Sequence, residues 1–321
     1  MIDNLVTAQG EQARAARARR LLGGLRDARI NQPEHQAQAL RDLGLDPVAG
    51  GRNNDVYQWS DADATPICVK VYRVDERRRL EREWNALTLL ASAGVDGIPR
   101  PLWCLDDPAM PVIGMTLLPG TSVPDLPDPV PAVTAMPDLL RRIHAAPLTA
   151  GFSRLPRIDS AEHYVERINR TWAVQLLQHE RDELTIELRG LLGRWRRSGD
   201  GDVACEWRPR TFSRGDANLI NWLWDGHTIR VVDFEFCGHS DLVFDAADLI
   251  EHISGRLIPD DIWQALLPEL GVAPQEQQRF RACQRTCALR WLAVLWKQRD
   301  QRAAEFGTQL TRVRHLFTDL P

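Results

Sequence analysis

The chain has 321 residues and a formal net charge of −4 at pH 7, and 44% of its residues are hydrophobic. This composition is typical of a globular protein of about two domains, and the slight acidity excludes a general electrostatic attraction to nucleic acid or anionic membranes. No apolar run reaches membrane-spanning length, no signal peptide is evident, and the six cysteines are scattered. We therefore expect a cytoplasmic protein without a nucleic-acid or membrane partner.

The N-terminal residues 1–46 are predicted to form a helical extension. Leu21, Leu22 and Leu25 make a modest apolar stripe, and several arginines lie beside them. One interpretation is a basic arm for nucleic acid. The other is a solvated helix that packs on the next domain, and it is favoured because the rest of the chain offers no second basic patch.

Residues 47–118 are predicted to form a small β-rich lobe. The pattern is strand, glycine turn and strand over 47–59, a third strand over 67–72, a helix over 75–93 with apolar period 3.6, and strands at 102–105 and 112–118. The turn at 50–55 could cover phosphates with its backbone N–H groups. It lacks the G-x-G-x-x-G pattern, so an ordinary hairpin turn remains the alternative.

Basic residues are almost all arginine. Of the 40 Lys and Arg residues, 38 are arginine, and the only lysines are Lys70 and Lys297. Lys70 falls within the apolar strand at 67–72, which is an unfavourable place for an unpaired charge. A compact ammonium differs chemically from a planar guanidinium. The sequence therefore indicates that lysine at position 70 serves a chemical purpose.

The remaining residues, 119–321, are predicted to form a larger helical lobe. The proline-rich stretch at 119–137 marks the boundary, and helical apolar spacing follows at 137–145, 160–177, 181–197 and from 241 to the end. Short strands flank the loop at 208–233. A small β-rich lobe followed by a larger helical lobe predicts an α+β, bilobal architecture.

The strongest motif in the chain lies at 213–223. Asp216 and Asn221 have the spacing D-x-x-x-x-N on a tight loop, and a short strand at 228–232 then leads to Asp233. Kinase-type phosphotransferases use one Asp to orient the attacking hydroxyl, and an Asn and a second Asp to hold Mg²⁺. Asp and Asn are also ordinary turn residues, but their order and spacing favour the catalytic interpretation.

In these residues the chain resembles the aminoglycoside phosphotransferase and choline kinase group, small-molecule kinases with a protein-kinase-like fold. The resemblance covers roughly 47–255. It implies that the γ-phosphate of ATP or GTP is transferred to a hydroxyl of a small molecule, with Mg²⁺. Helices after the boundary, with His144, and the segment around Asp245 are also similar to the family.

The resemblance also implies roles for individual residues. Lys70 would contact the nucleotide phosphates and pair with Glu83, or with Glu81 as the alternative. Asp216 would be the catalytic residue, and Asn221 and Asp233 the magnesium ligands. The nucleotide-binding turn would include Gly50, Gly51, Asn53 and Asn54.

The chain departs from the family at Arg214, where histidine is common. Arg214 could brace the loop by pairing with a carboxylate, or it could contact the substrate. Downstream, the carboxylates of Asp245, Asp248 and Glu251 could form an acidic wall for a cationic acceptor such as an aminosugar or a choline-like amine. The alternative is that acidic residues here cap the helix and hold the loops.

Two other functions are compatible with this pattern. The first is a nucleotide-binding regulatory protein that has lost catalysis, and the joint presence of Lys70, Asp216, Asn221 and Asp233 argues against it. The second is a protein kinase. It ranks lower because the stretch after Asp233 offers no obvious activation segment.

Overall fold

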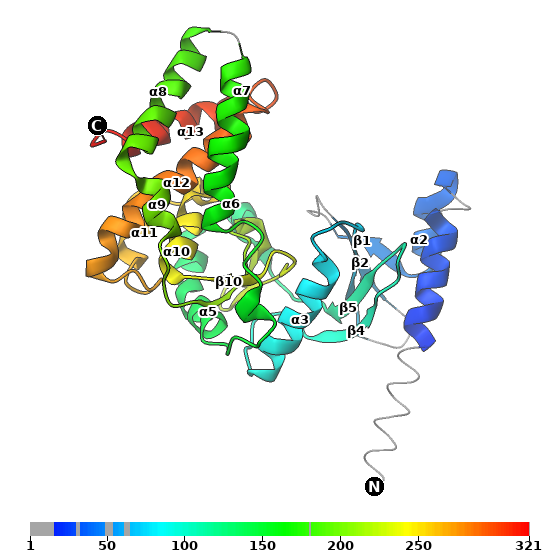
Figure 1. Ribbon diagram of the computed structural model, residues 1–321. Coiled ribbons are helices and arrows are strands. Elements are labelled where there is room, and N and C mark those ends of the chain that lie inside the picture. The colour runs from blue at the N-terminus through cyan, green and yellow to red at the C-terminus, as the bar shows by residue number, and fades with distance from the viewer. Residues whose placement is uncertain (1–15, 30–32, 49–53, 61–64, 180, 321) are drawn as a thin grey trace. The chain divides into compact units, whose positions relative to one another are not determined.

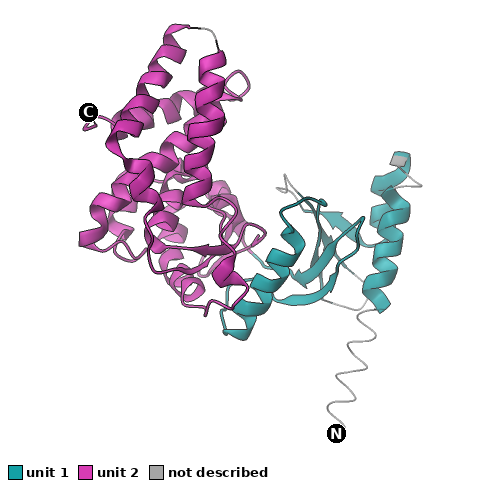
Figure 2. Ribbon diagram, in the orientation of Figure 1, with its two compact units in different colours: residues 1–119 teal, residues 120–321 magenta. Residues whose placement is uncertain are grey.

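The computed structural model describes residues 16–29, 33–48, 54–60, 65–179 and 181–320. The chain divides into two compact units, residues 1–119 and 120–321 (Figure 2). The first is built on an antiparallel sheet and the second is mainly helical. None of the helices in the described ranges has the length and apolar content to span a bilayer.

Unit 1 is organised around a five-stranded sheet with the strand order β1-β2-β3-β5-β4. Every pairing in it is antiparallel, and the central strand β3 pairs with both β2 and β5. Residues 50–53 of the predicted turn at 50–55 lie outside the described residues. The strands are β1 (Leu45–Pro47), β2 (Asp55–Trp59), β3 (Ile67–Val71), β4 (Pro101–Leu105) and β5 (Val112–Thr116).

Helices cover both sides of this sheet (Figure 1). The helix of residues 16–29 buries Leu21 and Leu25 in one core with Trp59 and Val69 of the strands, so the N-terminal helix shares the core of the sheet. α2 (Gln36–Asp42) follows it, after a short 3₁₀ turn (Pro33–His35). α3 (Arg79–Ser92) lies on the other side of the sheet. Because side chains alternate along a strand, β3 presents Val69 to the first core and Lys70 to the α3 side.

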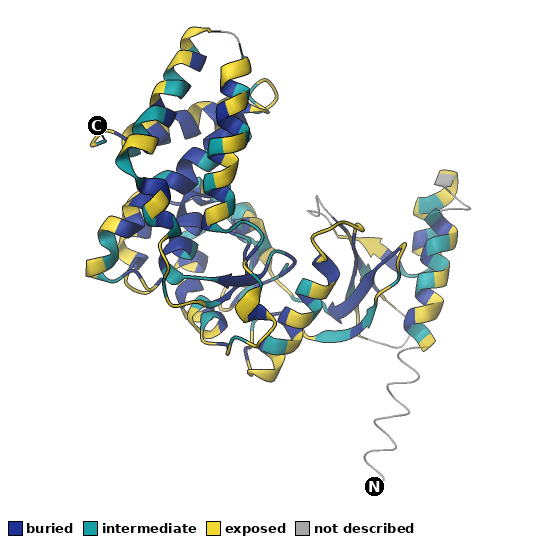
Figure 3. Ribbon diagram, viewed as in Figure 1, coloured by how far each residue is buried: buried dark blue, intermediate teal, exposed yellow. Residues whose placement is uncertain are grey.

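Unit 2 is a helical assembly around α12 (Gln277–Trp296), in which 13 of 20 residues are buried (Figure 3). α12 packs against α6, α9, α10 and α13. The other helices are α4 (Val130–Thr134), α5 (Met136–His144), α6 (Ala161–Glu166), α7 (Ala173–Gln178), α8 (Glu183–Ser198), α9 (Asp200–Cys205), α10 (Leu242–Glu251), α11 (Asp260–Leu266) and α13 (Ala303–Leu316).

The predicted helix at 160–177 is continuous, but its hydrogen-bond pattern changes in the middle. α6 and α7 are joined by the π-helical segment Arg167–Trp172. The extra residue per turn in such segments changes which side chains face a neighbouring helix, and π-helical turns are frequent at functional sites. Here the neighbouring helix is α12.

Two small antiparallel sheets position the motif loop of unit 2. β7 (Thr211–Ser213) pairs with β10 (Gly238–Ser240), and β8 (Trp222–Trp224) pairs with β6 (Thr121–Ser122) and β9 (Ile229–Val231). The motif residues therefore lie between the end of β7 and the start of β8. Asp233 follows β9, as the strand pattern predicts.

Candidate active site

The lysine of β3 forms a buried ion pair with α3. Lys70 Nζ lies 2.6 Å from Glu83 Oε2, and the side chains are 6% and 1% exposed. Tyr72 donates a second hydrogen bond of 2.6 Å to the same oxygen. The Glu83 carboxylate neutralises the buried ammonium and fixes its position. Glu83, rather than the alternative Glu81, is the partner; Glu81 pairs with Arg78 on the helix surface.

Of the four residues assigned to nucleotide binding in the predicted turn, the structure describes Asn54. Its side chain is buried and its Oδ1 accepts a hydrogen bond of 3.2 Å from the backbone N–H of Arg73. This bond fastens the end of the turn to the residues after β3. Gly50, Gly51 and Asn53 lie outside the described residues.

Asp216 is held by its own loop. Its Oδ1 accepts a hydrogen bond of 2.9 Å from the Asn218 backbone N–H, and its Oδ2 accepts one of 2.5 Å from the Asn221 side chain. The carboxylate keeps 21% exposure. The D-x-x-x-x-N spacing thus brings the two side chains into direct contact, because the short 3₁₀ turn Leu219–Asn221 folds back on Asp216.

Gly215 allows this loop to pack closely on the segment after Asp233. Its φ is +81°, and a Cβ at this position would lie 2.1 Å from the backbone oxygen of Phe236. An L side chain is therefore excluded both by conformation and by contact. Asp233 itself has a φ of 68°, a left-handed conformation that Asp tolerates better than most residues. The two loops are interlocked at this point.

Asn221 and Asp233 fit a magnesium site by their chemistry. The backbone N–H of Val232, next to Asp233, donates 2.9 Å to the carbonyl of Asn221. The two candidate ligands thus lie side by side, Asn221 just before β8 and Asp233 just after β9. The Asn221 amide nitrogen is engaged with Asp216, and its Oδ1 has no hydrogen bond to any described residue. Amide and carboxylate oxygens are the hard ligands that Mg²⁺ prefers.

Arg214 lies beneath the loop. It is buried, and its Nη1 donates 3.1 Å to the carbonyl of Asp233 and lies 3.8 Å from Asp216 Oδ2. Burial lowers its pKa, although the charges of Asp216 and Asp233 oppose this. Burial likewise raises the pKa of Asp216 to about 6; the charge of Asp233 adds to the rise and that of Arg214 opposes it. Of the two predicted roles for Arg214, these contacts describe the brace.

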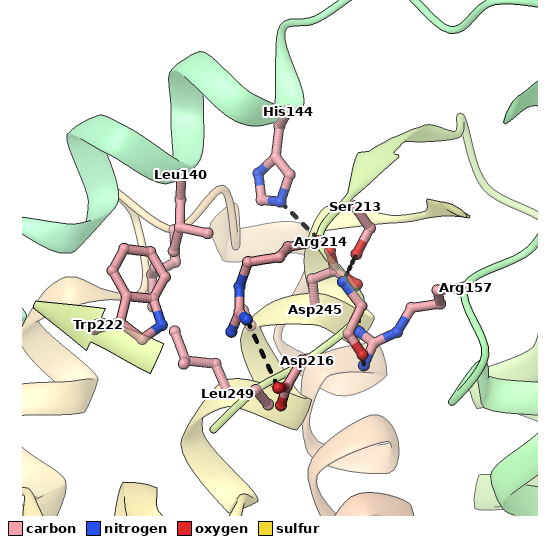
Figure 4. Close-up of a pocket in the computed structure, with 13 residues that line it drawn as sticks. Leu140, His144, Arg157, Ser213, Arg214, Asp216, Trp222, Asp245 and Leu249 are labelled. Carbon is pink, nitrogen blue, oxygen red and sulfur yellow. Dashed lines mark hydrogen bonds and ion pairs between the residues drawn. The ribbon is translucent and has the colours of Figure 1, made fainter. Parts of the chain in front are cut away.

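A pocket in unit 2 opens beside these residues (Figure 4). In it Arg214 points toward Asp216, and His144 of α5 approaches Asp245 Oδ2 at 3.3 Å. The wall is both polar and apolar. It is formed by Leu140, His144, Arg157, Ser213, Arg214, Gly215, Asp216, Ala217, Trp222, Asp245, Ala246, Leu249 and Leu270.

Arg157 is a site residue that the sequence analysis missed. Its guanidinium is 3% exposed, lies 2.8 Å from Asp245 Oδ1 and also pairs with Asp248. Its Nη2 donates 3.0 Å to the carbonyl of Gly215, next to Asp216. Nothing marked this residue in advance, because it is one of 38 arginines. It ties α10 to the loop that carries Asp216.

The three predicted substrate carboxylates of α10 have other partners. Asp245 lines the pocket, but the charge of Arg157 and the hydrogen bond from His144 outweigh burial and hold its pKa far below its usual range. Asp248 is 1% exposed and accepts a hydrogen bond from Tyr164. Glu251 is fully buried and is bound by Arg312 and Gln284 on the far helices. Asp248 and Glu251 are not among the pocket residues.

A second contact supports the loop from below. Ser254 Oγ accepts a hydrogen bond of 2.9 Å from the backbone N–H of Leu219, and lies 2.6 Å from His252 Nδ1. The backbone N–H of Ser254 donates 3.1 Å to the same Nδ1, so this nitrogen is an acceptor. The Ser254 hydroxyl therefore donates to His252, whose imidazole is neutral with its proton on Nε2. Burial lowers the pKa of His252 to about 3. His252 thus fixes Ser254, and Ser254 fixes the 3₁₀ turn that carries Asn221.

The sequence itself matches a known family. The model of the phosphotransferase enzyme family matches residues 44–283, about three quarters of the chain. The chain belongs to the phosphotransferase enzyme family. This confirms the predicted resemblance and the prediction of an enzyme that transfers phosphate. No curated protein matches the chain.

Solved structures of phosphotransferases share the fold, which confirms the predicted α+β, kinase-like architecture. A choline/ethanolamine kinase family protein from Mesorhizobium loti is 19% identical, with a TM-score of 0.60 over 88% of this chain and 94% of its own. Aminoglycoside phosphotransferase APH(4)-Ia is 16% identical (TM-score 0.62, 88% and 96%). Spectinomycin phosphotransferase APH(9)-Ia, solved with ADP and spectinomycin, is 14% identical (TM-score 0.58, 84% and 88%).

Proposed function

We propose that this phosphotransferase moves the γ-phosphate of ATP or GTP to a hydroxyl group of a small molecule. The observation that carries the proposal is the held but accessible Asp216, which is oriented by Asn218 and Asn221 and has a pKa raised to about 6. A carboxylate with such a pKa is ionised near neutral pH yet basic enough to accept a hydroxyl proton. Two phosphotransferases with the same fold were solved with ADP and a small molecule, hygromycin B in one and spectinomycin in the other.

Each residue of the site then has a defined task. Lys70, fixed by Glu83, binds nucleotide phosphate oxygens, and Asn54 supports the adjoining turn; we keep Gly50, Gly51 and Asn53 as part of that turn. Asn221 and Asp233 would hold Mg²⁺, which supplies positive charge to the phosphates. Unit 1 is thus assigned to the nucleotide and unit 2 to the acceptor and the transfer.

Proton transfer balances in this scheme. The acceptor oxygen forms a bond to the γ-phosphorus, the bond from that phosphorus to the β–γ bridging oxygen breaks, and the nucleoside diphosphate leaves. Asp216 accepts the proton of the hydroxyl as this occurs. Arg214 and Arg157 hold the loop, through the carbonyls of Asp233 and Gly215 respectively, so that the carboxylate stays in position.

The six cysteines are all free thiols, and this supports a reducing compartment, so we retain the cytoplasm as part of the proposal. A screen for acceptor-dependent release of ADP or GDP, with Mg²⁺ and a panel of hydroxyl compounds, tests the function. Turnover that Asp216→Asn abolishes supports it. Nucleotide binding without any such turnover would instead support the regulatory alternative, and phosphorylation of proteins alone would support a protein kinase.

A further inference from the structure

The second lysine of the chain, Lys297, has no role in the scheme above. It is the residue directly after α12, and it is exposed. Arg290 precedes it by seven residues, which is two helical turns, so both side chains leave α12 on the same face. A chain that uses arginine at 38 of 40 basic positions has placed its only other lysine here. A compact, mobile ammonium suits a different task from a planar guanidinium.

A third cation faces this pair. Arg167 is the first residue of the π-helical segment Arg167–Trp172, and α12 packs against that segment and against α6. Burial lowers the pKa of Lys297, and the charges of Arg167 and Arg290 lower it further. Arg290 and Lys297 on one face of α12, and Arg167 on the segment that packs against α12, form a group of basic side chains that we call the cation cluster.

The cation cluster lacks the partners that other arginines of α12 have. Arg279 and Arg285 lie 2.6 Å from the carboxylates of Asp241 and Asp200. In the part of the chain that the structure describes, no hydrogen bond or ion pair reaches the charged groups of the cluster. Arg290 only stacks on Tyr164, with its Cζ 5.5 Å from the ring centre, and its buried Nε has no partner among the described residues.

One carboxylate lies nearby but does not neutralise the cluster. Asp159 lies 3.2 Å from His163 Nδ1. Burial would raise its pKa, but the hydrogen bond with His163 and the charges of Arg157 and Arg290 outweigh burial and lower it. Three cations against this one carboxylate leave an excess of positive charge. A surface that repels itself in this way is stabilised by an anion.

Contacts connect the cluster to the catalytic loop. Arg290 stacks on Tyr164, Tyr164 donates 2.9 Å to Asp248, and Asp248 pairs with Arg157, which holds the carbonyl of Gly215. A second route begins at Trp291, the residue after Arg290, whose ring centre lies 4.5 Å from that of His252. His252 contacts Ser254, and Ser254 accepts a hydrogen bond from the backbone N–H of Leu219. Asp216 lies between Gly215 and Leu219 in the same loop.

We propose that Arg167, Arg290 and Lys297 bind an oxyanion group, phosphate or carboxylate, on the acceptor whose hydroxyl Asp216 orients. The inference rests on the proposed function and names its substrate class: a small hydroxyl compound with negative charge. It replaces the cationic acceptor expected from α10, whose carboxylates are paired internally. Arginine binds such groups through its fork of N–H donors, and the lysine ammonium adds a point charge.

Inorganic sulfate tests the anion site without any knowledge of the acceptor. The thermal stability of the full chain is measured with Mg²⁺ and saturating ADP or GDP, in sulfate and in chloride of equal ionic strength. Lys297→Gln and Arg290→Gln are compared with Arg281→Gln, an exposed residue of α12 that lies nine positions before Arg290 and thus on the opposite face. We expect sulfate to raise the Tm of the wild type and of Arg281→Gln. The rise in Tm should be much smaller in Lys297→Gln and Arg290→Gln.

The acceptor class is tested with matched compounds, such as a sugar, its amino sugar, its uronic acid and its phosphate ester. The anionic members should be phosphorylated best, and Lys297→Gln should raise their KM at least tenfold while Arg281→Gln does not. The uronic acid and the phosphate ester distinguish carboxylate from phosphate. The proposal is overturned if sulfate raises the Tm equally in all variants. It is also overturned if the best acceptor is neutral or cationic and its KM does not change in Lys297→Gln.

Failure of the proposed function gives a different result. No compound would then cause nucleotide turnover that depends on Asp216. The assignment of the anion to an acceptor would fall with it, whereas the sulfate response would still decide whether the cation cluster binds anions.

Discussion

Unit 2 holds carboxylates in two different environments, one on the loop that carries Asp216 and the other on α10. Asp216 on the catalytic loop keeps 21% exposure and has a pKa raised to about 6. Asp248 and Glu251 on α10 are at most 1% exposed, and arginine, tyrosine and glutamine side chains bind them. Asp216 can still bind a ligand through its carboxylate, whereas the carboxylate oxygens of Asp248 and Glu251 are already bound by side chains inside the fold.

The difference comes from partners that lie far away in the sequence. Arg157 reaches Asp248 across 91 residues, and Arg312 reaches Glu251 across 61. Asp216 is instead held by residues of its own loop, two and five positions away. Local contacts hold the reactive group in position, and long-range ion pairs make the surrounding frame rigid.

The sharpest test of this comparison is Asp216→Asn. Because the variant loses the group that accepts the proton, kcat should fall by about 10²- to 10⁴-fold, while the Kd for Mg-nucleotide changes little. Steady-state kinetics and nucleotide titration measure the two. A fall in kcat of less than about tenfold would remove Asp216 from its assigned role. Asp202→Asn, an exposed carboxylate on α9, is the control.

The same variant should not lose stability. The folded pKa of Asp216 is raised, so the folded chain binds more protons than the unfolded chain between about pH 4 and 6, and stability falls as the pH rises through this window. Asparagine removes that cost. At pH 8 without Mg²⁺, Asp216→Asn should unfold at the same or a higher temperature than the wild type.

Asp248→Asn should show the reverse behaviour. It leaves the buried Arg157 with one carboxylate instead of two, and removal of one partner of a buried ion pair costs about 3 kcal/mol of unfolding free energy. Urea unfolding measures this loss. The acceptor KM should change less than tenfold. A variant of normal stability with a strongly raised acceptor KM would place Asp248 in the acceptor site after all.

Lys70→Arg tests the buried Lys70–Glu83 ion pair, which the proposed function assigns to nucleotide binding. The charge is kept, but a guanidinium does not fit the 2.6 Å contact with Glu83 in a strand position that is 5% exposed. We expect kcat/KM for Mg-nucleotide to fall at least tenfold, which is about 1.4 kcal/mol. Near-normal kinetics for Lys70→Arg would show that only charge is required.

The smallest expected effect concerns a neutral side chain of the frame. Burial lowers the pKa of His252 to about 3, the charges of Arg214 and Arg302 lower it further, and that of Asp159 opposes them. The unfolded chain then binds more protons below about pH 6.5, so this group reduces stability by up to about 1.4 kcal/mol per pH unit as the pH falls toward 3. Chemical unfolding from pH 7 to pH 5 should show a steeper loss for the wild type than for His252→Gln. Parallel curves would contradict the neutral buried state.

Much of the fold was predictable because its signals are local. Alternating apolar residues gave the strands at 55–59, 67–71 and 112–116 within a few positions, and the glycine- and proline-rich punctuation gave the turns. Helix starts were less accurate: α3 begins at Arg79 rather than at 75. The π-helical segment was not predictable, since the pattern of apolar residues continues through it. The π-helical segment packs against α12, and local residue preference does not indicate it.

The site divides in the same way. The D-x-x-x-x-N spacing and the isolated lysine were readable, because each is a short motif with a chemical meaning. The pairing of Lys70 with Glu83 rather than Glu81 depended on which face of α3 meets the sheet. Arg157 could not be recognised among so many arginines. Its role depends on the two carboxylates that the tertiary structure brings within reach of its guanidinium.

The contact between Gly215 and Phe236 has a consequence for regulation. Many kinases are switched by a segment after the metal-binding aspartate that swings between an ordered and a displaced position. Here the backbone oxygen of Phe236 fills the place of a side chain at Gly215, so displacement of one loop would unseat the other. We therefore expect no resting form with an intact catalytic loop and a displaced metal loop.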